Sequence, residues 1–227
     1  MTDTADRDRA VLRARQQRWD SKVATDACWY ISRPPPELET ALAGWSPEAG
    51  EAALDIGCGP GTVTAHLADR FSLAVGLDVA LGAAQEARRV GADRPHPPRF
   101  LLAEAPSFPF ASGSFSLVFD RGVLHHVPAG TWPTYFHEVA RILRPGGLYF
   151  QYCPERSLPG VLSYRGLRAR AGRAVRKRPS RADAMRRAVP AAMSVVEIRQ
   201  FPFTARNGDV LKFTFGLFRK EGPAGPG

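Results

Sequence analysis

Short apolar runs alternate with amphipathic stretches through the middle of the chain. A short apolar run, followed by a stretch with apolar residues every three or four positions, is typical of a strand followed by a helix. Repeated along the chain, this alternation predicts parallel strands joined by helices. The predicted strands are 52–56, 73–77, 99–103, 115–119 and 148–152, and the predicted helices are 37–43, 62–69, 80–90 and 131–143.

The two ends of the chain depart from this alternation. Near the N-terminus, apolar residues on one narrow stripe predict a helix over 6–23, and prolines 34–36 separate it from the next helix. Near the C-terminus, the β-rich runs 195–203 and 211–218 flank Asn207-Gly208, which is typical of an antiparallel hairpin. The whole pattern predicts an α/β three-layer sandwich with a seven-stranded, mostly parallel sheet, whose C-terminal antiparallel hairpin supplies the reversed edge.

Composition agrees with one folded domain. Of the 227 residues, 44% are hydrophobic and 23% are charged, and no stretch approaches the roughly 20 apolar residues that a membrane-spanning helix requires. The charged N-terminus lacks the apolar core of a signal peptide, so we expect a cytoplasmic protein. The three cysteines are isolated and lack metal-ligand spacing, so we expect no bound metal.

Net charge changes this picture at one place. The formal charge is +9, and the basic excess is concentrated between Arg156 and Arg187, where eleven basic residues stand against one acid. Such a run is most often a solvated helix face, but it also suits an anionic partner. Nucleic acid and a small acidic molecule are both candidate partners at this point.

Three glycines at alternate positions, Gly57, Gly59 and Gly61, separate a predicted buried strand from its helix. Glycine permits positive φ and lets a ligand approach the backbone closely, and the helix amides that follow attract a negatively charged group such as a carboxylate. Asp55, just before the glycines, can hold a cationic amine. The segment is therefore a candidate ligand-binding loop.

An acid at the end of the next predicted strand adds to this candidate site. Asp78 stands where a ribose diol would find a bidentate acceptor. A nicotinamide dinucleotide would need the fingerprint G-x-G-x-x-G, and Thr62 occupies the position of its third glycine. The G-x-G-x-G spacing therefore disfavours a dehydrogenase.

Five short motifs follow one another between residues 51 and 153. They read D-I-G-C-G-P-G, G-L-D-V, F-P-F-A-S-G-S-F-S-L-V, L-H-H-V and L-R-P-G-G. In this order they resemble the motifs of the class I S-adenosylmethionine-dependent methyltransferases of the small-molecule type, which implies a Rossmann-like fold and S-adenosylmethionine as cofactor. Trp29-Tyr30, 34–38 and 119–122 add a resemblance to the thiopurine and tellurite methyltransferase branch.

The resemblance implies roles for individual residues. The glycine loop would line the methionine part of the cofactor, Asp78 would bind both ribose hydroxyls, and Asp55 would help to hold the methionine amine. Glu104 and the amide of Ala105 correspond to the adenine contacts, and Arg121 to a backbone contact with the methionine part. The cofactor-binding set implied in this way is Asp55, Gly57, Cys58, Gly59, Gly61, Asp78, Val79, Glu104, Ala105 and Arg121.

Two histidines follow the strand predicted over 115–119. His125 and His126 are the candidate catalytic residues, because a histidine can accept the proton of an alcohol or phenol at neutral pH. A thiolate, halide or amine acceptor would need no base, and the simpler interpretation is that the histidines cap a helix or pack beneath the cofactor. A metal cluster with Asp120 and His137 is also imaginable, but no ligand-spaced motif supports it.

The sequence thus predicts a single methyltransferase domain over 1–227. Its parts are an N-terminal helical cap (1–48), a cofactor-binding core (49–154), a basic cap insert (155–193) and the C-terminal hairpin (194–222). In the family that the chain resembles, the N-terminal helices and the insert after the fifth strand usually enclose the acceptor. Trp19, Trp29 and Tyr30 are therefore candidates either to anchor the cap or to line the acceptor pocket.

The predicted function is transfer of a methyl group from S-adenosylmethionine to the O, N or S atom of a small-molecule acceptor. An acidic molecule is one candidate acceptor, and bacterial secondary metabolism is a candidate setting. An RNA or DNA methyltransferase is disfavoured, because residues 120–123 replace the usual Asn or Asp-Pro-Pro-aromatic string and the basic segment offers only Tyr164 for stacking. A cofactor-binding protein without methyl transfer is the alternative from another class. No membrane partner is expected, and the oligomeric state is not predicted.

Overall fold

The computed structural model describes residues 19, 30–92, 94, 96–155, 180–205 and 208–222. Among these residues, no helix has the length and apolarity that crossing a bilayer would require. The strands are β1 (Ala52–Ile56), β2 (Leu73–Asp78), β3 (Arg99–Leu102), β4 (Phe115–Arg121), β5 (Leu143–Pro154), β6 (Met193–Thr204) and β7 (Val210–Lys220). The helices are α2 (Pro36–Ala43), α3 (Thr62–Ala68), α4 (Leu81–Gly91), α5 (Trp132–Ile142), α6 (Arg181–Ala188) and the 3-10 helices η1 (Leu124–His126) and η2 (Ala129–Thr131).

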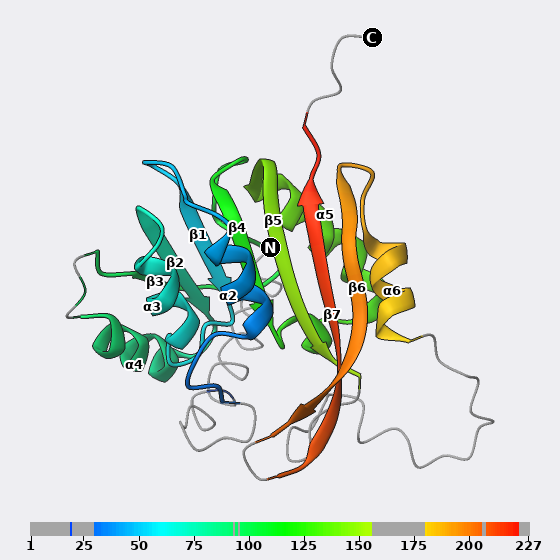
Figure 1. Cartoon of the computed structure of the whole chain (residues 1–227), viewed down its shortest axis with the longest axis horizontal. Coiled ribbons are helices and arrows are strands. Elements are labelled where there is room, and N and C mark those ends of the chain that lie inside the picture. Colours follow the sequence, from blue (N-terminus) through cyan, green and yellow to red (C-terminus); the bar gives the residue numbers. More distant parts are fainter. Residues whose placement is uncertain are drawn as a thin grey trace, which may run out of the picture.

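All seven strands form one sheet in the order β3-β2-β1-β4-β5-β7-β6 (Figure 1). The first five pair in parallel, and β7 pairs antiparallel with both β5 and β6. The predicted fold class and the C-terminal hairpin are confirmed. One detail is wrong: the reversed strand β7 lies inside the sheet, because the hairpin folds back so that its second strand pairs with β5, which leaves β6 as the edge.

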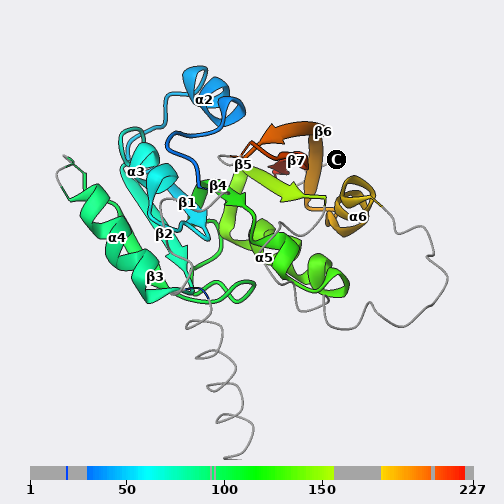
Figure 2. The same cartoon turned by 90° about the horizontal axis from the view of Figure 1, so that it is seen from below.

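Helices cover both faces of the sheet (Figure 2). On one face α2, α3 and α4 lie together, and Leu38 and Leu67 pack among the strand residues Phe119 and Phe150. On the other face α5 and α6 carry apolar residues into a second cluster. Because both faces are covered, every residue of β1 is buried, which is the usual reason for a continuous apolar run in a parallel strand.

The junction of α5 and β5 differs from the prediction. The predicted strand was 148–152, but α5 ends at Ile142 and β5 already begins at Leu143, which pairs with Phe115. The register then shifts, so that Leu148 pairs with Leu117, and Gly146 adopts a φ of +78° within the irregular segment. Proline and glycine therefore mark a bulge inside the strand here rather than a turn before it.

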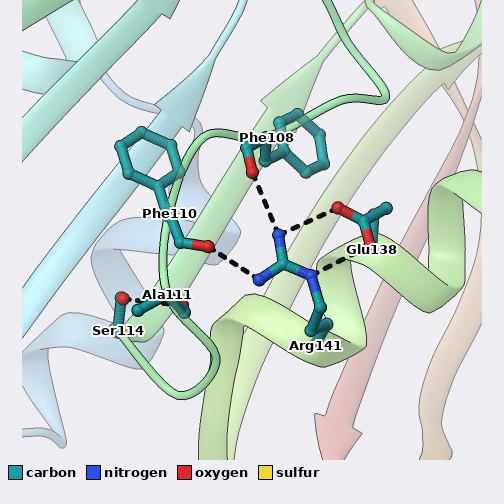
Figure 3. Close-up of polar contacts among 6 residues, drawn as sticks. All are labelled: Phe108, Phe110, Ala111, Ser114, Glu138 and Arg141. Carbon is teal, nitrogen blue, oxygen red and sulfur yellow. Dashed lines mark hydrogen bonds and ion pairs between the residues drawn. The ribbon is translucent and has the colours of Figure 1, made fainter.

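An irregular loop, 103–114, joins β3 to β4 and is held by one side chain of α5. The guanidinium of Arg141 donates hydrogen bonds to the carbonyl oxygens of Phe108 at 3.0 Å and Phe110 at 2.6 Å (Figure 3). Glu138, one turn earlier, accepts two further hydrogen bonds from the same guanidinium and fixes its orientation. The start of this loop carries Glu104 and Ala105, so Arg141 positions a segment of the expected cofactor site.

Replacing Arg141 with alanine should destabilise the protein measurably. The variant leaves two loop carbonyls without their charged donor, and hydrogen bonds to charged groups contribute roughly 1.5–3 kcal/mol each when well formed, so we expect a loss of about 2 kcal/mol in urea unfolding. Arg89→Ala is the matched control, because Arg89 also pairs with a glutamate three residues earlier but holds no loop. Equal losses in the two variants would show that the loop contacts contribute nothing.

Candidate active site

The loop that follows β1 is tied to the end of β2. The amides of Gly57 and Cys58 donate to the carbonyl oxygen of Leu77 at 2.6 and 3.1 Å, and the amide of Gly59 donates to Asp78 Oδ2 at 2.9 Å. Parallel strands end at the same edge of a sheet, so these contacts bring the predicted loop and the predicted acid together. This edge, at the carboxyl ends of the strands, is where α/β folds of this kind bind ligands.

Glycine is required in this loop for two different reasons. Gly57 has a φ of +69°, and a Cβ there would clash with the Val123 side chain, so the residue permits close packing of the turn after β4. Gly59 has a φ of +51°, and no atom of the described residues lies within 4 Å of where its Cβ would be. Among these residues, the side of Gly59 that lacks a side chain is therefore open beside the Asp78 carboxylate, and a ligand can approach the backbone there.

Asp78 links two turns through both of its oxygens. Oδ1 accepts from the amide of Ala80 at 2.9 Å, while Oδ2 accepts from Gly59. Both oxygens of the carboxylate therefore accept from backbone amides at the strand ends. Val79 lies between the two tied residues. The predicted role of Asp78 toward a ribose stays a prediction, and the structure shows a different one, because this carboxylate orders the glycine loop.

Asp55 is buried in β1 and accepts a hydrogen bond from Thr64 Oγ1 at 2.7 Å. Burial raises the pKa of its carboxyl to about 7, and the charge of nearby Asp78 acts in the same direction, whereas the Thr64 hydroxyl opposes the shift. A cationic group bound close by would favour the ionised carboxylate. A ligand's ammonium group that binds close to Asp55 would therefore favour loss of the proton from this carboxyl near neutral pH.

The expected adenine side lies after β3. The amide of Ala103 donates to the backbone oxygen of Asp78 at 3.0 Å, which places the next two residues, Glu104 and Ala105, beside the end of β2. The loop that they begin is the one held by Arg141 (Figure 3). Their assignment to the adenine ring stays a prediction.

The buried carboxylate of Asp120 organises the turn after β4. From the sequence, this residue was considered only as a ligand in a metal cluster. Asp120 is fully enclosed; its Oδ1 accepts from the amide of Val123 at 2.9 Å, and its Oδ2 accepts from Tyr135 at 2.7 Å and Tyr149 at 3.3 Å. Burial raises the pKa of this carboxyl to about 6. Asp120 thus anchors the turn that carries both histidines to α5 and β5.

His125 and His126 stand together at the end of that turn, with ring centroids 3.7 Å apart. His126 is exposed and meets Trp19 edge to face at 4.8 Å. Both ring nitrogens of His125 are shielded from solvent and have no hydrogen-bond partner among the described residues. Burial lowers the pKa of His125 well below its ordinary value, and the nearby charges of His126 and Arg181 act in the same direction, so its imidazole is neutral at pH 7.

The side chain of Arg121 forms a feature that sequence reasoning missed. The sequence implied only a backbone contact, but the guanidinium is buried, 5.0 Å from the ring centroid of Phe203 and 5.7 Å from that of Phe213. Burial lowers its pKa to about 10, so the group remains charged. Nothing local in the sequence signals this contact, because its partners come from β6 and β7.

Other candidates take different places. Tyr30 lies at the glycine loop, where its hydroxyl accepts from Thr62 Oγ1 at 3.5 Å, while His137 is exposed on α5 and contacts the carbonyl of Pro133. Within the described part of the chain, no three residues are grouped so as to hold a metal ion. Trp29, the helix expected over 6–23 except Trp19, and residues 156–179 of the basic segment lie outside the described residues.

Comparison with known proteins agrees with this geometry. Residues 53–147 match the family model described as a methyltransferase domain. The 2-heptyl-1-hydroxyquinolin-4(1H)-one methyltransferase of Mycobacteroides abscessus is 31% identical over 132 residues, which are 56% of each chain. The chain spans about half the length of the curated relatives that it matches first.

Solved structures show the same fold over most of the chain. A structure described for the conversion of a disulfide bond into a thioacetal group during echinomycin biosynthesis has a TM-score of 0.71 at 20% identity and covers 92% of this chain and 93% of its own. The N-methyltransferase NodS of Bradyrhizobium japonicum, in complex with S-adenosyl-L-homocysteine, has a TM-score of 0.61 at 19% identity, with coverages of 90% and 97%. Residues 53–147 thus match a methyltransferase domain, and the chain shares its fold with NodS.

Replacing Asp78 with alanine should weaken binding of S-adenosylhomocysteine at least about tenfold in calorimetry, because hydrogen bonds to a charged acceptor contribute roughly 1.5–3 kcal/mol each. Asp78→Asn keeps one acceptor oxygen and should give an intermediate loss. Asp69→Ala, which removes an exposed acid at the end of α3, is the control and should bind as the unaltered chain does. Unchanged affinity in Asp78→Ala would refute the assignment.

Affinity for S-adenosylhomocysteine should rise about tenfold between pH 6 and pH 8, because the pKa of Asp55 is about 7 and its ionised form is the one that favours the ligand's ammonium group. Calorimetry across this range measures the change. In Asp55→Asn the rise should vanish. In Thr64→Val, which removes the hydroxyl that stabilises the carboxylate, it should move to higher pH. A rise that persists in Asp55→Asn would contradict this account.

Proposed function

We propose that this chain transfers a methyl group from S-adenosylmethionine to a small-molecule acceptor. The observation that carries the proposal is the open side of Gly59 beside the Asp78 carboxylate, at the edge where β1 and β2 end. A glycine without a side chain, next to an acceptor for hydroxyl groups, suits the methionine and ribose parts of that cofactor. The NodS structure, which has the same fold, contains the related S-adenosyl-L-homocysteine.

The residues present fit this cofactor. Gly57, Gly59 and Gly61 would hold its methionine part, Asp78 its ribose and Asp55 its amine. Glu104 and Ala105 would contact its adenine. Cys58, Val79 and the backbone of Arg121 complete the proposed binding set.

S-adenosylmethionine supplies a methyl group that its sulfonium already activates, so the protein has to align the acceptor more than it has to activate it. Alignment of two reactants can supply roughly 7–11 kcal/mol of the barrier. The tied turns after β1, β2 and β4 provide this alignment by fixing the loop, Asp78 and the histidines on one frame.

A histidine of the turn after β4 takes the acceptor's proton when the acceptor is an alcohol or phenol. His125 suits this task because its imidazole is neutral at pH 7 and its nitrogens are enclosed. The ring of His126 lies against that of His125 at an angle of 43° and contacts Trp19, so it forms the outer part of the same site. An acceptor that is nucleophilic without a base would use the turn only for positioning.

The acceptor that we propose is small and acidic. The named relatives include a hydroxyquinolone methyltransferase, and the basic segment begins next to the end of β5. Use of the basic segment on RNA or DNA would rest on residues outside the described part, and no contact favours it. We also propose a cytoplasmic location, since Cys58 and Cys153 are both reduced and buried, as is usual in a reducing compartment.

Alanine at His125 should lower the rate of methyl transfer to a phenolic acceptor by roughly 10²–10⁴, with affinity for S-adenosylhomocysteine near that of the unaltered chain. His126→Ala is the paired variant and should have a smaller effect, because its ring is exposed. Rates are measured by methyl incorporation from labelled cofactor. A parallel loss of cofactor affinity and rate in both variants would instead mark the histidines as structural.

A further inference from the structure

The N-terminus of α6 meets the histidine turn on the α5 face of the sheet. Arg181 is the first residue of α6, and its guanidinium lies over the ring of Trp132, 5.2 Å from the centroid. Trp132 in turn donates from its indole nitrogen to the carbonyl of Val127 at 3.2 Å, at the end of the turn that carries the histidines. One buried tryptophan thus contacts both Arg181 and the end of the turn that carries His125.

His125 supplies an independent sign of a ligand at this place. An imidazole has one donor and one acceptor, and leaving both unmet in a shielded position costs free energy. Neither ring nitrogen finds a partner among the described residues, and the ring lies against Gly122, which has no side chain to reach it. A polar group brought by a ligand would satisfy the imidazole.

The guanidinium of Arg181 has no ion-pair partner within the described part of the chain. The acid next to it, Glu155, uses one oxygen to accept from the backbone amide of Arg181 at 3.3 Å. Its other oxygen accepts from Gln200 at 2.8 Å and from Thr214. Glu155 therefore fixes the start of α6 against β5, β6 and β7 without neutralising the Arg181 side chain.

We propose that Arg181 is a specificity-determining residue, which binds a carboxylate or another anionic group of the acceptor beside His125. This inference rests on the proposed function and deepens it by naming the residue that recognises the acid. A guanidinium presents a planar fork of donors that matches a carboxylate, and its stacking on Trp132 holds that fork in place. A neutral His125 beside it can then meet the acceptor's hydroxyl.

The electrostatics of the pair favour an acidic ligand over a basic one. The groups that act on His125 are His126 of the same turn and Arg181 of α6, and the positive charge on either opposes protonation of His125. A cationic acceptor would add a further like charge, whereas an anion would offset the one already present. The same arrangement keeps the imidazole free to accept a proton while the acid is bound.

The experiment uses the full chain saturated with S-adenosylhomocysteine, with benzoate and its neutral isostere benzamide as probes. Histidine ring signals are followed by NMR, and the His125 signal is assigned from its absence in His125→Gln. We expect benzoate to shift this signal and to bind at least about tenfold more tightly than benzamide. Equal affinity for the two probes would overturn the proposal.

Three variants separate recognition from general charge. Arg181→Gln should lose the preference for benzoate, and Arg181→Lys should keep part of it, because lysine has the charge without the planar fork. Arg187→Gln removes an equal charge from the last turn of α6 and should retain the full preference. A loss of the same size in Arg187→Gln would show that the field of the segment, rather than Arg181, selects the acid.

One readout does not depend on the proposed function. In the absence of any probe, Arg181→Gln should raise the pKa of His125, since it removes a nearby positive charge. An unchanged His125 titration would refute the pairing itself. If S-adenosylhomocysteine fails to bind, the proposed function fails, and the benzoate titration of the ligand-free chain still tests Arg181 alone.

Discussion

The site depends on hydrogen bonds through which carboxylates near the strand ends hold the turns that follow. Asp78 accepts from Gly59 and Ala80, and so joins the loop after β1 to the start of α4. Asp120 accepts from Val123 and from Tyr135, and so joins the turn after β4 to α5. Burial of the Asp120 carboxylate costs desolvation and raises its pKa to about 6, and the hydrogen bonds that it accepts oppose this rise. In return, both turns are fixed on the same sheet edge.

The part of this arrangement that is local in sequence could be predicted from the sequence. The glycine loop and Asp78 each lie at the end of an apolar run, so strand periodicity alone brings them to one edge. The partners of Asp120 could not be found in this way, because Tyr135 and Tyr149 come from α5 and β5 and look like ordinary core residues. The same limit explains the position of β7, since a hairpin signal at Asn207-Gly208 gives the pairing of two strands but not which of them meets β5.

The acceptor side is built from elements that are distant in the sequence. The β6–β7 ladder continues to Thr204 and Val210, beyond the pair of Pro154 with Phe213 at which β5 ends, so the hairpin extends past the sheet edge (Figure 1). On one face of this extension Phe203 packs against the guanidinium of Arg121. These contacts couple the end of β4 to a hairpin that lies outside the residues matched by the methyltransferase model.

The proposed contacts to the cofactor and to the acceptor thus lie in different parts of the chain. The carboxylates that hold the cofactor loop lie within residues 53–147, whereas Arg181 and the hairpin lie after them. Asp120 joins the two parts, because it fixes the turn whose histidine faces α6. Changes in α6 or in the hairpin can therefore alter which acceptor is bound without disturbing Asp78 and its loop. Asp78 and its loop are held by hydrogen bonds within the core, so their positions do not depend on α6 or the hairpin.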